Sequence, residues 1–350
     1  MAESSNWTHL HAQLHRTLLH RQILPSNQRL LVAVSGGQDS LCLIKLLLDL
    51  QPKWGWNLAI AHCDHRWRSD SEASANHVEQ LAKNWGISYY LQTASDIPKT
   101  EAAARQWRYQ ALTEIAIARN YPYIVTGHTA SDRAETLLYN LIRGSGADGL
   151  SALTWMRPLA NFPLENLNEF VKSKISLVRP LLEITRSQTG QFCQEQKLAI
   201  WEDSTNQDFK YARNRIRSEL LPYLETHFNP KAQQALAQTA ELIRADVEYL
   251  ELAASDLLQR AMSPIGDSPQ VNVQLPVKLN RPILREAPLA LQRRAMRQLL
   301  QQILPSAPSF ESVEKLTSLI AAPNRSQTDP FPGGAIARVE NPSIILDMRF

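Results

Sequence analysis

Short apolar runs alternate with amphipathic stretches along the first 150 residues of the chain. Brief runs rich in β-branched, aliphatic or aromatic residues are typical of buried strands, and they occur at residues 30–34, 58–62, 89–91 and 123–126. Helical patterns lie before, between and after them, at residues 8–24, 41–50, 71–85, 100–120 and 131–143. Strands that alternate with helices predict an α/β fold, with an open parallel sheet covered by helices on both faces.

The pattern changes after about residue 218. A long helical pattern covers residues 230–262, two more follow at 288–304 and 309–321, and short β-like runs lie at 271–275, 335–339 and 343–347. Residues 158–178 show no clear period and are expected to be an excursion near the sheet. We therefore predict two domains, an α/β domain over residues 1–217 and a mostly helical domain over residues 218–350.

Composition limits the class of protein. Of the 350 residues, 44% are hydrophobic and 20% are charged, as in an ordinary globular protein. No apolar run approaches the roughly 20 residues that span a bilayer, and the first residues do not resemble a secretory signal. The three cysteines include no CxxC pair, which argues against a disulfide framework or a zinc ribbon. We expect a cytoplasmic protein that does not enter a membrane.

One basic stretch stands out from the small net charge of +3. Residues 278–297 contain one acidic residue, Glu286, and six basic ones, which are Lys278, Arg281, Arg285, Arg293, Arg294 and Arg297. A local basic patch fits an anionic partner such as RNA, which makes the second domain a candidate for RNA contact. The alternative is an ordinary solvated helix face.

A glycine turn between the first predicted strand and the next helix is the strongest local signal. It reads Ser35-Gly36-Gly37-Gln38-Asp39-Ser40. Glycines let the backbone approach a ligand closely, and the N–H groups at the start of a helix favour a phosphate. The two serines add hydroxyl donors, and Asp39 can hold Mg²⁺ against the phosphates. The spacing is neither that of a Walker A loop nor GxGxxG, and a plain helix N-cap turn is the alternative.

A second set of polar residues follows the predicted strand 123–126. Asp132 and Glu135 are three apart and share one helix face, where they can hold a metal or accept a proton from an attacking amine. Capping of the helix N-terminus by acids is the alternative. His128 follows a strand that should end at the carboxyl edge of the sheet, where α/β proteins bind ligands.

Five segments in order resemble the PP-loop ATP pyrophosphatase superfamily, and within it the tRNA(Ile)-lysidine synthetase family. The turn at 35–40 resembles its SGGxDS loop, and 101–109 resembles its ExxARxxRY helix. The other three segments resemble GHHxDDxxET, RGSGxxGL and DxxN…YxRNxxR, at residues 126–136, 143–150 and 203–217. Ser131 stands where the family commonly has the first of two aspartates.

The resemblance implies an activity and a set of site residues. Enzymes of this family use ATP to adenylate the oxygen on carbon 2 of the wobble cytidine in a CAU-anticodon tRNA(Ile). The ε-amine of L-lysine then displaces AMP. The implied catalytic residues are Asp39, Asp132, Glu135 and Arg213, with Asp39 and Asp132 also holding Mg²⁺. The implied nucleotide-binding residues are those of the 35–40 turn and His128. The implied tRNA-binding residues are Arg105, Arg108, Arg143 and Arg217.

Two alternatives remain open at this point. One is another PP-loop enzyme, such as a tRNA thiolase, although thiolation usually needs paired cysteines. The other is a non-catalytic RNA-binding relative, although such a protein has no need of Asp39, Asp132 or Glu135. The sequence also leaves open whether the chain forms a homodimer.

Overall fold

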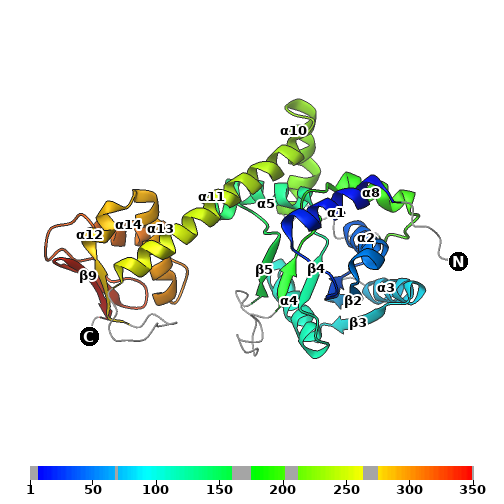
Figure 1. The fold of residues 1–350 in the computed structure, drawn as a ribbon, viewed down its shortest axis with the longest axis horizontal. Coiled ribbons are helices and arrows are strands. Elements are labelled where there is room, and N and C mark those ends of the chain that lie inside the picture. Colours follow the sequence, from blue (N-terminus) through cyan, green and yellow to red (C-terminus); the bar gives the residue numbers. More distant parts are fainter. Residues whose placement is uncertain (1–6, 68–69, 160–174, 202–211, 263–274, 349–350) are drawn as a thin grey trace. The chain divides into compact units, whose positions relative to one another are not determined.

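The computed structural model describes residues 7–67, 70–159, 175–201, 212–262 and 275–348. The chain divides into two compact units, Met1–Ile243 and Arg244–Phe350 (Figure 1). This division comes later than the predicted one between residues 217 and 218. Ile216, Leu221 and Ala240 explain the difference, because they pack in one apolar cluster with Leu137 of the first unit. Among the described helices, none is both long and apolar enough to cross a membrane.

The first unit contains a six-stranded sheet in the order β3-β2-β1-β4-β6-β5. The strands are β1 (Arg29–Ala33), β2 (Asn57–Asp64), β3 (Ser88–Thr93), β4 (Tyr123–Thr126), β5 (Met156–Pro158) and β6 (Ser176–Val178). All neighbours pair in parallel except β5, which runs antiparallel to β6 at the edge. The predicted α/β fold is confirmed, with an antiparallel edge that three-residue strands are too short to signal in the sequence.

Helices cover both faces of this sheet (Figure 1). Side chains alternate along β1, so Leu30 and Val32 face one apolar cluster while Leu31 faces another. The first cluster includes residues of α1 (His9–Arg21), α2 (Gln38–Trp54), α3 (Ser71–Trp85) and α8 (Arg186–Glu195). The second includes residues of α4 (Glu101–Ala118). The buried strands therefore read as continuous apolar runs, as the sequence predicted.

The remaining helices of the first unit follow β4 or precede the unit boundary. They are α5 (Ala130–Ile142), α6 (Ala147–Leu150), α9 (Ala212–Arg215), the π-helix η3 (Ile216–Leu220) and α10 (Leu221–His227). The long helix α11 (Ala232–Ala261) begins in this unit. Cys42 and Cys193 are both fully buried in the first apolar cluster, so their thiols serve packing.

A buried ion pair anchors α5 inside the first unit. Arg133, 1% exposed, donates from Nη1 to Glu241 at 2.8 Å and from Nη2 to the Leu153 carbonyl at 3.0 Å. Glu241 also accepts hydrogen bonds from Arg21 at 2.7 Å and from the indole of Trp155 at 3.0 Å. The start of α11 is thereby fixed against the helix that carries Asp132.

The second unit combines helices with a small antiparallel sheet in the order β7-β9-β8. Its elements after α11 are β7 (Val277–Asn280), α12 (Arg281–Glu286), α13 (Leu289–Ile303), α14 (Phe310–Ser318), β8 (Ala335–Glu340) and β9 (Ser343–Met348). The helices predicted at 288–304 and 309–321 and the two last β-like runs are confirmed, and those two runs pair with each other. Of the run predicted at 271–275, residues 271–274 lie outside the described residues.

Candidate nucleotide-binding site

The glycine turn after β1 leaves the start of α2 open to a ligand. Gly37 is the N-cap residue, and no side chain caps the helix with a hydrogen bond in this described segment. The hydroxyls of Ser35 and Ser40 lie 3.3 Å apart, and Ser40 donates to the Gly37 carbonyl at 2.8 Å. N–H groups at an uncapped helix start, with two hydroxyls beside them, form a cradle suited to a phosphate.

Two residues of the turn have structural tasks. Gly36 adopts a φ of +87°, which favours glycine, and its carbonyl accepts the N–H of Trp201 at 3.0 Å. The side chain of Gln38 donates to the Arg186 carbonyl at 2.6 Å and to the hydroxyl of Thr189 at 2.8 Å. The side chain of Gln38 thus fixes the start of α8. Only the backbone of Gln38 is left to bind a nucleotide as predicted.

The topology brings a second turn beside the first. β1 and β4 are parallel neighbours, so the turns that follow them meet at the carboxyl edge of the sheet. Gly127 makes this approach close: a Cβ there would lie 2.9 Å from the carbonyl oxygen of Asp39. The turn after β4 therefore rests on the backbone of the phosphate turn.

Three carboxylates predicted as catalytic gather at this edge. Asp132 and Glu135 lie on the first turns of α5, and Asp39 on the first turn of α2. Thr129 caps α5, and its N–H and hydroxyl both donate to Oδ2 of Asp132, at 2.7 and 2.8 Å. The helix-capping alternative for Asp132 is thus part of its role, and its other oxygen faces the site.

Two arginines offset part of the negative charge of the three carboxylates. Arg186 donates from Nε and Nη2 to Oδ2 of Asp39, at 2.9 and 2.8 Å, and its Nη2 lies 3.6 Å from Oδ1 of Asp132. Arg217 forms a two-bond pair with Glu135, at 2.6 and 2.7 Å, and its Nη2 also lies 3.6 Å from Asp132. Arg217, predicted to bind tRNA, is engaged with Glu135, one of the carboxylates predicted as catalytic.

The environment separates the pKa values of the two carboxyls on α5. Burial raises the pKa of Glu135 above its ordinary value, and Arg217 only partly offsets this. Burial acts in the same direction on Asp132, but Arg186 and the two hydrogen bonds from Thr129 hold the pKa of Asp132 below its ordinary value. Asp132 is therefore suited to hold a cation, and Glu135 to accept a proton.

His128 lies beside these groups as a neutral imidazole. Burial, with the positive charge of Arg179, lowers the pKa of His128 to about 3, and its Nδ1 lies 2.9 Å from the hydroxyl of Thr126. A neutral ring at this position can donate or accept a hydrogen bond with a bound nucleotide without adding charge.

Replacing His128 by Gln is expected to flatten the pH dependence of stability. The folded protein keeps the ring neutral, while the unfolded chain takes up a proton below pH about 6.5, so wild-type stability falls as the pH drops from there toward 3. For each unit by which the pH falls, the free energy of unfolding of the variant should decrease by up to about 1.4 kcal/mol less than that of the wild type. Urea unfolding at pH 7, 6 and 5 measures this difference, and parallel curves for the two proteins would mean that the folded protein protonates His128.

The other predicted arginines lie apart from the carboxylates. Arg213 pairs with Glu101 at 3.7 Å, and Arg143 donates to the hydroxyl of Tyr139 at 2.9 Å. Arg105 lies over the ring of Tyr109, and Arg108 is exposed. The described contacts bring none of these four to Asp39, Asp132 or Glu135, so their catalytic and tRNA-binding roles stay predictions.

Arg186 and Thr189 are site residues that the sequence reasoning missed. The hydroxyl of Thr189 donates to Oδ1 of Asp39, opposite the oxygen that Arg186 binds. Both residues lie at the start of α8, nearly 150 positions from the phosphate turn. Thr185 and Gln188 form a capping box there, and this T-x-x-Q pattern was the available signal for a helix start.

The carboxylates fit a magnesium ion that is shared with phosphates. One guanidinium nitrogen already faces both Asp39 and Asp132, so their oxygens converge on a common point. In the described residues, no group of three or more His, Cys, Asp and Glu side chains could hold a metal by itself. Mg²⁺ is usually held by one or two carboxylates plus substrate phosphates, which is the arrangement available here.

In the second unit, most of the basic stretch 278–297 is engaged internally. Arg281 is 3% exposed and donates to the Ile320 carbonyl, while Arg294 and Arg297 pair with Glu251. These three arginines therefore form neither a basic patch open to a ligand nor a solvated helix face, because the sequence shows charges but not their partners.

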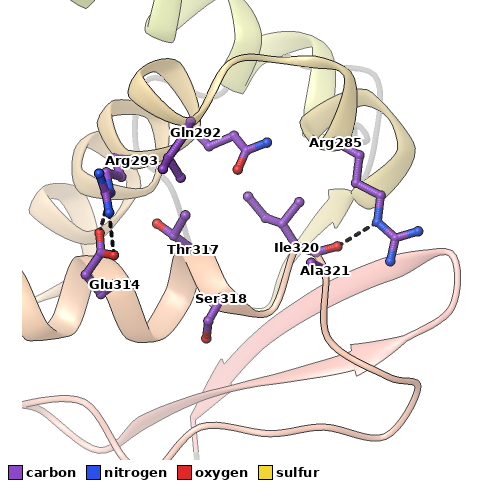
Figure 2. A pocket seen from close by; sticks show the side chains of 9 residues that line it. Arg285, Gln292, Arg293, Glu314, Thr317, Ser318, Ile320 and Ala321 are labelled. Carbon is purple, nitrogen blue, oxygen red and sulfur yellow. Dashed lines mark hydrogen bonds and ion pairs between the residues drawn. The ribbon is translucent and has the colours of Figure 1, made fainter.

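Figure 2 shows a pocket of about 550 Å³ on this unit. On one side Arg293 makes two bonds to Glu314, at 2.6 and 2.8 Å, and on the other Arg285 donates to the Ile320 carbonyl at 2.8 Å (Figure 2). Arg285 and Lys278 are exposed, and neither has a carboxylate partner among the described residues. These two residues are the cations of the stretch that remain available to a ligand.

Comparisons with known proteins agree with both units. A family profile described as a PP-loop domain matches residues 8–224, and another, the TilS substrate binding domain, matches residues 279–341. The chain is 67% identical over 344 residues to the tRNA(Ile)-lysidine synthase of Nostoc sp., covering 97% of each. It is 52% identical over 334 residues to that of Synechocystis sp., covering 95% of this chain and 96% of the relative.

A solved structure shares the fold at low identity. The U34-tRNA thiolase NcsA from Methanococcus maripaludis matches with a TM-score of 0.53 and 17% identity, over 67% of this chain and 77% of that one. This likeness is one of fold alone, and it gives no support to the thiolase alternative. Because the lysidine synthases match nearly the whole chain at high identity, the chain belongs to the tRNA(Ile)-lysidine synthase family.

Proposed function

We propose that this enzyme attaches L-lysine to carbon 2 of the wobble cytidine of CAU-anticodon tRNA(Ile), with ATP as the source of activation. Lysidine, AMP and pyrophosphate are the products, and the reaction belongs in the cytoplasm, where tRNA is modified. The observation that carries the proposal is the meeting of a phosphate cradle with Asp39, Asp132 and Glu135 at one sheet edge, in a chain of this family.

In the first step, the cytidine carbonyl oxygen attacks the α-phosphorus of ATP and the bond to the β-phosphate breaks. The N–H groups at the start of α2 and the hydroxyls of Ser35 and Ser40 would hold the leaving pyrophosphate. Asp39 and Asp132 would hold Mg²⁺, which supplies charge stabilisation to the phosphates. His128, as a neutral ring, would contact the nucleotide without repelling a metal.

In the second step, the lysine ε-amine attacks carbon 2 of the base and AMP leaves. The amine must first lose a proton, and Glu135 is the acceptor that its raised pKa favours. Arg217 holds both oxygens of Glu135 and so orients the carboxylate. Asp132, which stays ionised, would remain with the cation.

A direct assay tests the proposal. The protein is mixed with ATP, Mg²⁺, labelled lysine and an unmodified CAU-anticodon tRNA(Ile) transcript, and label in the tRNA is measured together with AMP. Label in the tRNA and an equal amount of AMP are expected. Modification of the tRNA that depends on a sulfur donor instead of lysine would establish a thiolase. Binding of the tRNA without formation of AMP would establish a non-catalytic relative.

The second unit is expected to contact tRNA through Lys278 and Arg285. Charge reversal at both positions, Lys278→Glu with Arg285→Glu, should weaken tRNA binding about tenfold or more at low salt and reduce the salt dependence by about two phosphate contacts. Filter binding at several salt concentrations measures both effects. Arg338→Glu, which changes a partly exposed arginine that pairs with Glu340, is the control. If the salt dependence of tRNA binding is unchanged, Lys278 and Arg285 do not contact tRNA and belong to an ordinary solvated face.

A further inference from the structure

One guanidinium faces all three catalytic carboxylates. Arg186 binds Oδ2 of Asp39 with two nitrogens, and its Nη2 lies 3.6 Å from Oδ1 of Asp132. Its Nη1 lies 4.0 Å from Oε1 of Glu135. Arg217 makes two short bonds to Glu135, and its Nη2 also lies 3.6 Å from Oδ1 of Asp132, so Arg186 is the cation that binds Asp39 and it shares Asp132 with Arg217.

Each aspartate is held from behind by a partner other than Arg186. Oδ1 of Asp39 accepts the hydroxyl of Thr189, while its Oδ2 faces the guanidinium. Oδ2 of Asp132 accepts two hydrogen bonds from Thr129, while its Oδ1 faces the guanidinium. Removing Arg186 from between them therefore leaves both carboxylates oriented toward the same point, as outer-shell partners orient metal ligands.

The main chain of Arg186 is fixed while its side chain has room to move. Its N–H donates to the hydroxyl of Ser131 at 3.1 Å, and its carbonyl accepts from Gln38 at 2.6 Å. The side chain is 33% exposed, against 13% for Asp39. Ser131, which replaces the aspartate common in the family, contributes a neutral contact here and adds no fourth negative charge.

We propose that Arg186 holds Asp39 and Asp132 while no nucleotide is bound, and yields them to Mg²⁺ when ATP enters, turning its guanidinium to the triphosphate. This inference rests on the proposed use of ATP and Mg²⁺. Three carboxylates with two guanidinium groups leave a net charge of −1, which invites a further cation. The guanidinium of an arginine can bind a phosphate with the same two-bond geometry with which it binds a carboxylate.

The exchange makes the metal and the nucleotide bind cooperatively. Metal alone must displace Arg186, which then has no anionic partner, so it binds weakly. With ATP present, the displaced guanidinium gains the phosphates, and the same metal binds more tightly. Loss of the guanidinium should therefore have opposite effects on the two ligands: tighter metal binding without nucleotide, and weaker nucleotide binding.

Binding of Mn²⁺ to the full chain, followed by the electron paramagnetic resonance signal of the free ion, tests this without tRNA or lysine. Arg186→Gln should bind Mn²⁺ about tenfold more tightly than wild type in the absence of nucleotide, and a non-hydrolysable ATP analogue about tenfold more weakly. Adding Asp39→Asn to this variant should abolish the gain. Arg260→Gln, on an exposed arginine of α11, should leave both affinities unchanged.

Equal Mn²⁺ affinity in folded Arg186→Gln and wild type would overturn the proposal, as would weaker Mn²⁺ binding in the variant. If Arg186→Gln does not fold, Arg186→Lys carries the test, because an ammonium loses the two-nitrogen grip and Mn²⁺ affinity should still rise about threefold. Since the measurement needs no lysine or tRNA, failure to form lysidine would count against the proposed function and not against this exchange.

Discussion

Asp39→Asn should reduce AMP formation by about a thousandfold while tRNA binding stays within a few-fold of wild type. The asparagine keeps the shape of the side chain but loses the charge that faces Arg186 and would hold the metal. Metal and charge stabilisation of a phosphoryl transition state contribute several kcal/mol, and about 4 kcal/mol corresponds to this factor. Single-turnover AMP release and filter binding of the tRNA measure the two quantities.

The matched control for this prediction is Asp49→Asn on the same helix. Asp49 bonds to Lys45 at 2.6 Å and to His11 at 3.1 Å, away from the phosphate turn, so its loss should leave the turnover of folded enzyme unchanged. Equal losses of AMP formation and tRNA binding in Asp39→Asn would assign Asp39 a structural role. Equal losses of AMP formation in the two variants would mean that the charge acts through stability.

Glu241→Ala should destabilise the first unit by about 3 kcal/mol, because it removes the carboxylate that pairs with the buried guanidinium of Arg133. The indole of Trp155 and the guanidinium of Arg21 lose the same acceptor. For a unit of this size, the melting temperature should fall by roughly 6–12 °C. Thermal unfolding followed by tryptophan fluorescence measures the shift.

Glu79→Ala on α3 of the same unit is the control, since Glu79 and its partner Lys83 are 40% and 63% exposed and lie 2.9 Å apart. It should change the melting temperature by little, as exposed ion pairs contribute at most about 1 kcal/mol. A shift in Glu241→Ala no larger than that of the control would show that Arg133 finds another partner or takes up water.

Local patterns along the chain were enough to predict the order of the main strands and helices, since each carries its own period. The strands β5 and β6 were missed because three residues do not establish a period. The Asp132–Glu135 pair was predicted from helical spacing, and its meeting with Asp39 followed from the parallel order of β1 and β4. Local and topological rules therefore account for the position of the site.

Contacts between distant segments could not be predicted in the same way. Arg186 reaches Asp39 only because α8 packs beside α2, and no local pattern marks that arginine as different from others. The ion pairs of the basic stretch 278–297 could not be predicted for the same reason. Glu251 and Glu314, which lie on other helices, pair with its arginines. Charge partners are decided by packing, and sequence counts alone cannot supply them.

The glycine after β4 allows the turn before α5 to lie against the backbone of Asp39. Alanine at Gly127 would place a methyl group 2.9 Å from the Asp39 carbonyl, so the phosphate turn and the start of α5 would have to separate. The gap between Asp39 and Asp132 would widen although neither was altered. Displacements of about 1 Å can slow an aligned reaction about a hundredfold. The rate of the proposed reaction therefore depends on Gly127, which takes no part in the chemistry but has a hydrogen atom in place of a side chain.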